Sequence, residues 1–116
     1  MKVYVVGFYK NDDRESVFRQ LSDWHRREII TDVITGGEET GTDLHAMQWA
    51  DENEIEYRTY KPDWKADGGS AAIKRNFVLY GQEKPDLILL FENARGVDNL
   101  TKLARDGKTQ IVQVEE

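Results

Sequence analysis

One stretch of the sequence decides its fold: Ile34-Thr35-Gly36-Gly37-Glu38-Glu39-Thr40-Gly41-Thr42-Asp43, in which an apolar strand runs through three glycines into a helix. Adjacent glycines let the backbone turn tightly and leave amide N–H groups uncovered. A helix that begins near Thr42 directs its unpaired N–H groups and its positive dipole end at the same place. A strand, a glycine loop and a helix N-terminus in this order commonly hold a phosphate or another anion.

Strand and helix patterns alternate along the rest of the chain. Segments of strand character are found at residues 3–7, 29–35, 54–60, 86–91 and 109–114. The segment from Asp86 to Phe91 is nearly all apolar, which is typical of a strand covered on both faces in a parallel sheet. Apolar residues at helical spacing lie between the strands, at residues 14–24, 42–50, 70–80 and 97–104. Ser70 is expected to cap the third helix, and Gly107 to end the fourth.

Five strands interleaved with four helices predict an α/β fold, a three-layer Rossmann-like sandwich with a five-stranded, mainly parallel sheet. Ligands are then expected beyond the C-terminal ends of the strands. Residues 1–116 are expected to form a single domain, because a chain of this length can bury one core without disulfides or metals. The polar segment 61–69 is expected to be one long connection.

The composition excludes several classes of function. With 22 acidic against 16 basic residues and a net charge of −6, broad nucleic-acid binding is not expected. No cysteine is present, so disulfides, thiolate metal sites and cysteine nucleophiles are excluded. His25 and His45 lack the spacing of zinc ligands, so no metal site is expected. No apolar run approaches the roughly 18 residues of a membrane span, so a cytoplasmic protein without membrane contact is predicted.

The order of the motifs resembles a known family. The chain reads GGxxxGTDxxAxxWA from Gly36, PxW from Pro62, GxxAxxxRN from Gly68, KPDLILLF from Lys84 and RGVxxLxxLA from Arg95. This order resembles the YspA-like (DUF2493) family of the SLOG superfamily, which groups Rossmann-like domains related to LOG lysine-decarboxylase-like and DprA/Smf proteins. The resemblance covers residues 2–114.

The resemblance implies a pocket for a nucleotide or a nucleotide derivative. LOG-like relatives hydrolyse the N-glycosidic bond of nucleotides, and other SLOG domains are thought to sense nucleotide-derived signals. The ligand-binding residues implied by position are Gly7, Gly36, Gly37, Gly41, Thr42, Asp43, Arg75, Asn76 and Gly96. The loop glycines and Thr42 would hold a phosphate through backbone amides, and Arg75 would neutralise it. Asn76 and Asp43 would contact the ribose or the base.

Two departures from the family bear on function. Glu38 and Glu39 stand where the family usually has a small residue or an arginine, and carboxylates in a phosphate loop oppose an anion unless they point to solvent or hold a metal. The turn at residues 92–98 lacks the PGGxGTxxE signature of LOG-type catalysis.

Three functions stay open on this basis, and the sequence does not decide whether the chain is an enzyme. The first is a SLOG-type domain that binds or senses a nucleotide-derived ligand. The second is a nucleotide N-glycosidic hydrolase, whose carboxylate would be one of Asp43, Glu39, Glu92 or Asp98. The third is a non-catalytic interaction module with a vestigial pocket, which the glutamates in the loop favour.

The expected partner is a small-molecule nucleotide, with no resident cofactor, and a magnesium ion accompanying the nucleotide stays open. Phe8, Tyr9 and Trp64 are candidates to stack on a base, or else anchor their loops. SLOG-like relatives often pair through helices, so the helices that carry Trp24 and Trp49 are candidate faces for a homodimer.

Overall fold

The computed structural model describes residues 1–91 and 97–114 of the chain. Its centre is a sheet with the strand order β3-β2-β1-β4-β5, in which every neighbouring pair is parallel. The strands are β1 (Lys2–Val6), β2 (Asp32–Thr35), β3 (Glu56–Thr59), β4 (Leu87–Leu90) and β5 (Gln110–Gln113). The predicted five-stranded α/β architecture is confirmed, and the sheet is parallel throughout.

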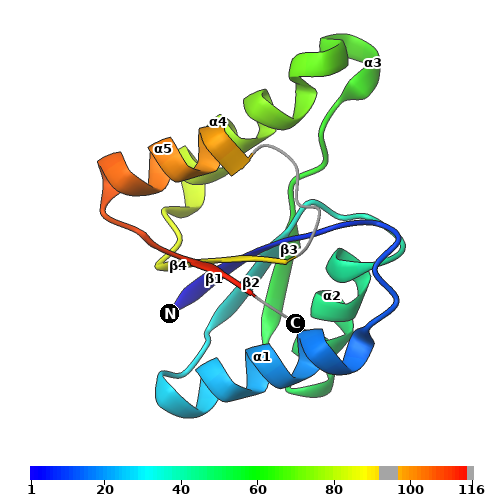
Figure 1. Ribbon diagram of the computed structural model, residues 1–116, viewed down its shortest axis with the longest axis vertical. Helices are drawn as coiled ribbons and strands as arrows, with labels where there is room; N and C mark the ends of the chain where they lie inside the picture. Colours follow the sequence, from blue (N-terminus) through cyan, green and yellow to red (C-terminus); the bar gives the residue numbers. More distant parts are fainter. Residues whose placement is uncertain (92–96, 115–116) are drawn as a thin grey trace.

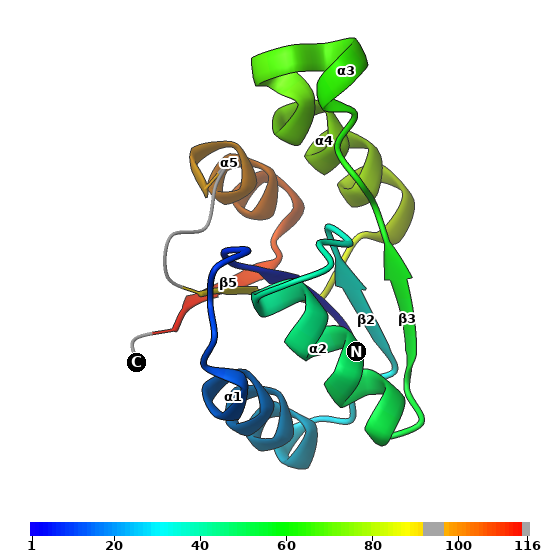
Figure 2. The ribbon, with the colours of Figure 1, turned by 90° about the vertical axis from the view of Figure 1, so that its right-hand side faces the viewer.

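Helices cover both faces of the sheet and complete the three layers. Helices α1 (Arg14–Arg27) and α2 (Thr42–Glu52) lie on one face, and α4 (Ala71–Glu83) and α5 (Val97–Gly107) lie on the other (Figure 1). The same separation is seen from the side in Figure 2, where the short helix α3 (Trp64–Asp67) lies at the far end of α4.

The core is divided between the two faces because successive strand residues point in opposite directions. Val3, Val5 and Leu89 belong to the cluster that packs beneath α1 and α2, together with the buried Trp49. Tyr4, Val6, Ile34, Ile88 and Leu90 belong to the cluster beneath α4 and α5. Strand β4 is therefore buried on both faces, as its apolar sequence predicts.

The connection at residues 61–69 differs from the expected loop because it contains α3 and a 3₁₀ turn, η1 (Gly68–Ser70). The carboxylate of Asp63 caps α3 by accepting the amide of Ala66 at 3.1 Å. Ser70 occupies the N-cap position of α4, but its side chain makes no capping bond and its hydroxyl donates instead to the carbonyl of Asp67. Ser70 is thus the N-cap residue that the sequence predicts, but its side chain does not cap the helix.

A charged cluster fixes α4 against the sheet. Arg58 of β3 donates to both carboxylate oxygens of Glu83, at 2.9 and 2.8 Å, and the hydroxyl of Tyr60 donates to the same group at 2.7 Å. Lys2 and Asp32 complete the cluster. The bonds from Arg58 lower the pKa of the buried Glu83 to about 2. The last turn of α4 is thus anchored, which sets the direction of the whole helix.

The strand order places the topological switch point at β1. The chain moves from β1 outward through β2 to β3, and then crosses to β4 and β5 on the other side of β1. In open parallel sheets, ligands bind beyond the C-terminal ends of the strands near such a point. The segments that follow β1, β2 and β3 all begin at this edge.

Candidate functional site

A cleft opens at the C-terminal ends of β1 and β2. It is bounded by the segments that follow these strands, by the start of α2, by the connection after β3 and by the first turns of α4. Its lining residues are Tyr4, Val5, Val6, Gly7, Phe8, Tyr9, Gly36, Glu38, Asp43, Pro62, Trp64, Ala72 and Arg75. One cation, two carboxylates and several aromatic rings therefore face the same space.

The double glycine lets two cationic side chains approach the backbone closely. A methyl group on Gly36 would lie 2.6 Å from Nη1 of Arg75 and 3.1 Å from Oδ2 of Asp43. A methyl group on Gly37, whose φ is +76°, would lie 3.0 Å from both Cγ and Cε of Lys61. A side chain at position 36 or 37 would crowd Arg75 or Lys61, so both side chains lie where they do because these two residues are glycines.

Two amides at the start of this loop are bonded within the chain. The amide of Gly37 donates to Oγ1 of Thr35 at 3.1 Å, and the amide of Glu38 donates to Oδ2 of Asp43 at 3.2 Å. The carboxylate of Asp43 therefore takes up one amide of the loop, and the phosphate cradle predicted from the glycines stays a prediction.

The second half of the motif joins two loops. The hydroxyl of Thr42 accepts the amide of Phe8 at 3.1 Å and the side-chain amide of Asn11 at 2.9 Å, and the Thr42 amide donates to the Phe8 carbonyl at 3.1 Å. Gly41, at φ +77°, and Gly7 leave room for this contact, since a methyl on either would overlap the facing loop. The predicted ligand-binding groups of Thr42 are thus used to fix the segment after β1.

Asp43 is a buried carboxyl group at the cleft. Its side chain is 8% exposed, and burial raises its pKa from 3.8 to about 6, against the lowering effect of the Glu38 amide and of the Arg75 charge. Its Oδ2 lies on the same side of Gly36 as the Arg75 guanidinium.

Arg75 is held in place from two sides. Its Nε donates to Oδ1 of Asn76 at 2.9 Å, and its Nη1 donates to the carbonyl of Tyr60 at 3.2 Å. Asn76 is fully buried, and the same Oδ1 accepts the hydroxyl of Tyr4 at 3.0 Å. Burial raises the pKa of Tyr4 to about 12, so its hydroxyl stays a donor. Asn76 therefore orients Arg75 from within the protein. It was predicted to contact the ligand, but it is not among the residues that line the cleft.

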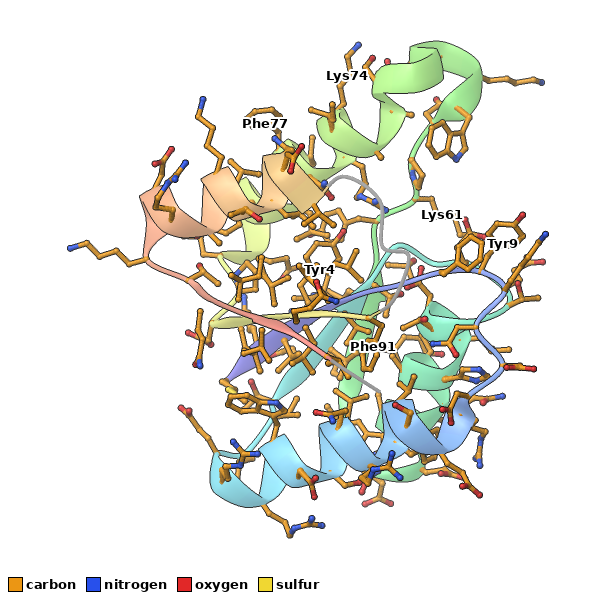
Figure 3. All side chains as sticks on the ribbon, in the orientation of Figure 1. Tyr4, Tyr9, Lys61, Lys74, Phe77 and Phe91 are labelled. Atoms are coloured by element: carbon orange, nitrogen blue, oxygen red, sulfur yellow. The ribbon has the colours of Figure 1, made fainter. Side chains whose placement is uncertain are left out.

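Two exposed aromatic rings stand at the rim of the cleft. Tyr9 is 44% exposed and meets Phe8 edge to face, with ring centres 4.8 Å apart, and Trp64 is 49% exposed. Figure 3 shows Tyr9 and Lys61 on the right-hand side of the view, whereas Tyr4 lies near its centre. These rings are placed where a planar group entering the cleft could stack on them.

Of the carboxylates that were candidates for hydrolysis, Asp43 lines the cleft. Glu39 and Asp98 are exposed and do not line it. Glu38, which was not one of these candidates, also lines the cleft. Glu92 and Gly96 lie outside the described residues.

Other predicted features are placed elsewhere. Within the described residues, no group of three or more histidine, aspartate or glutamate side chains is placed to hold a metal ion. In the same residues no helix has the length and apolar character that a membrane crossing requires. Trp49 is 1% exposed and donates to Ser22 at 2.9 Å, so its ring belongs to the core. The homodimer itself stays a prediction.

Sequence reasoning missed Lys61 and the internal roles of Asn76 and Thr42. The signal for Lys61 was its place directly after the third predicted strand, where side chains gather at the sheet edge. No signal in the sequence showed that Asn76 would be fully buried.

Comparison with known proteins identifies the family of the chain. The model of the YspA, cpYpsA-related SLOG family, YAcAr, matches residues 1–66, and the chain therefore belongs to this family. The match includes the glycine loop and Lys61, and ends before Arg75. Searches of the curated proteins and of the solved structures gave no match.

Proposed function

We propose that this chain binds a phosphate-bearing nucleotide or nucleotide derivative in the cleft beyond β1 and β2. The orientation of Arg75 carries the proposal. Asn76 and Tyr60 fix its Nε and Nη1, and its guanidinium lies over Gly36 at the cleft wall. An arginine held this way presents its remaining donors to a phosphate with little loss of side-chain freedom on binding. Membership of a SLOG family supports a nucleotide-related ligand.

The other lining residues suit the rest of a nucleotide. Tyr9 and Trp64 offer faces for a base, and Asp43 offers an acceptor for a ribose hydroxyl. Because Asp43 and Glu38 repel a phosphate, the proposed pose puts the phosphate at the Arg75 end and the sugar beside Asp43. We also propose that the chain works as one domain in the cytoplasm.

A second candidate, hydrolysis of a nucleotide N-glycosidic bond, is favoured by one observation. Among the four carboxylates considered for it, Asp43 lines the cleft and has its pKa raised to about 6. In that reaction the bond from C1′ to the base breaks, and water supplies a hydroxyl to C1′ and a proton to the base. A carboxylate beside C1′ would stabilise the positive charge that develops on the sugar.

The test is a thermal-shift screen with nucleoside mono- and diphosphates, ADP-ribose, NAD and cyclic dinucleotides, each with and without magnesium. A ligand that binds the folded protein raises the melting temperature with concentration. Arg75→Ala and Arg75→Lys should weaken any hit about ten- to a hundredfold, since a hydrogen bond to a charged group contributes about 1.5–3 kcal/mol. The control is Arg105→Ala, because Arg105 is exposed near the end of α5 and outside the cleft.

Three results separate the candidate functions. A hit that Arg75→Ala removes, and Arg105→Ala leaves, supports nucleotide binding. Release of free base from that hit, measured by chromatography and abolished in Asp43→Asn, supports hydrolysis. No shift with any nucleotide contradicts both and favours the interaction module with a vestigial pocket.

A further inference from the structure

A second cleft adjoins the first and shares Arg75 with it. It lies between the connection after β3 and the outer side of α4, and Lys61, Lys74, Asp63 and Asp67 contribute to its walls. Arg75 therefore forms part of the wall of both clefts.

Lys61 and Arg75 each pack against one of two consecutive glycines. Nη1 of Arg75 lies 2.6 Å from the β position of Gly36, and Cγ and Cε of Lys61 lie 3.0 Å from that of Gly37. Both side chains also contribute to the wall of the second cleft. Two cationic side chains on one wall attract an anion more strongly than one does.

The other charged groups of the second cleft already have partners. The ammonium of Lys74 pairs with Asp67 at 2.9 Å, and the carboxylate of Asp63 accepts the amide of Ala66. In the described part of the chain, neither Lys61 nor Arg75 forms an ion pair. Lys61 and Arg75 are therefore the cationic side chains of the two clefts that have no ion-pair partner among the described residues.

We propose that the site selects nucleotides that carry two linked phosphates, with one phosphate on Arg75 and the second on Lys61 in the adjoining cleft. This inference rests on the proposed nucleotide binding and names its ligand class. Nucleoside diphosphates belong to the class, as do nucleotide derivatives joined through a diphosphate. A monophosphate occupies the Arg75 position alone and leaves Lys61 without a ligand contact.

The alternative is that Lys61 acts only through its aliphatic stem, which packs against Gly37. Lys61→Met separates the two roles, because methionine keeps an unbranched stem and removes the charge. The matched control is Lys65→Met, which removes an equal charge from an exposed position on α3 that lines neither cleft. Lys61→Gln serves as a second neutral variant, and the melting temperature of each variant without ligand checks that it folds.

The experiment is isothermal titration of the wild-type protein and the variants with the mono- and diphosphates of adenosine, guanosine, cytidine and uridine. The nucleoside that binds should bind the wild type about tenfold more tightly as its diphosphate, the effect of one charge-assisted hydrogen bond. Lys61→Met and Lys61→Gln should reduce this ratio to about twofold or less through weaker diphosphate binding, with monophosphate affinity unchanged. Lys65→Met should keep the wild-type ratio.

Equal affinity for mono- and diphosphate in the wild type would overturn the inference and leave nucleotide binding intact. A diphosphate preference that survives in both Lys61 variants would do the same. Failure of every nucleotide to bind would overturn the proposed function, and this inference with it.

Discussion

Replacing Gly36 with alanine should damage ligand binding while leaving the fold intact. A methyl group at this position would lie 2.6 Å from Nη1 of Arg75, whereas ordinary contacts begin at 3.4 Å, so the guanidinium must retreat by about 0.8 Å. The atom that must move is the end of a flexible side chain. The backbone does not resist, because Gly36 is not among the glycines with positive φ.

The effect on stability should be small. Moving Arg75 weakens its 3.2 Å bond to the Tyr60 carbonyl, worth about 1 kcal/mol. Alanine restores about 0.4–1 kcal/mol by restricting the unfolded chain. The free energy of unfolding in urea should therefore stay within about 1 kcal/mol of wild type.

The effect on affinity should be large, because the displaced guanidinium no longer meets the phosphate at hydrogen-bonding distance. Titration with the best nucleotide of the screen should show a loss of about ten- to a hundredfold. Gly81→Ala is the control: this glycine is exposed on α4 with no atom near its β position, so its replacement should leave affinity unchanged. Wild-type affinity in Gly36→Ala would refute the placement of Arg75 as the ligand's anchor.

Three further predictions concern the groups around the cleft. The pKa of Asp43 is about 6 in the folded state, so between pH 4 and 6 the folded state keeps a proton that the unfolded state has lost. This group should therefore lower the free energy of unfolding by about 3 kcal/mol as the pH rises from 4 to 6. Asp43→Asn should remove this decrease from unfolding curves measured between pH 4 and 6, and an unchanged pH profile would contradict the raised pKa. Glu83→Gln should lower the free energy of unfolding by about 2 kcal/mol at pH 7, because it removes the charged partner of Arg58. The loss should be much smaller near pH 2, where the Glu83 carboxylate of the wild type becomes protonated. Equal losses at both pH values would rule out the ion pair as the cause. Thr42→Val should cost about 2 kcal/mol in urea unfolding, because it leaves the amide of Phe8 without its acceptor, and a loss below about 0.5 kcal/mol would argue against that link.

The fold could be predicted because its signals are local. The apolar run at residues 86–91 and the glycine motif at 36–43 each fix a strand end or a helix start without reference to distant residues. The short helix α3 was missed because it consists of four residues and is held by one capping carboxylate, which leaves no apolar period to detect.

The site could be predicted only in part, because it depends on contacts between segments far apart in the sequence. The double glycine and Arg75 were identified, but the close approach of Arg75 and Lys61 to these glycines was not. A glycine that exposes its amide and a glycine that admits a facing side chain look the same in a sequence. Asn76 likewise looked like a ligand group, and its burial follows from the packing of α4 on Tyr4.

The most direct test of the central claim is a ¹H–¹⁵N NMR titration of the wild-type protein with the four nucleoside diphosphates. The account predicts that the largest shifts will fall on the amides of Gly36 to Glu38, on the side-chain Nε–H of Arg75 and on the indole N–H of Trp64. Shifts confined to α1 or α5, or no shifts with any nucleotide, would contradict it.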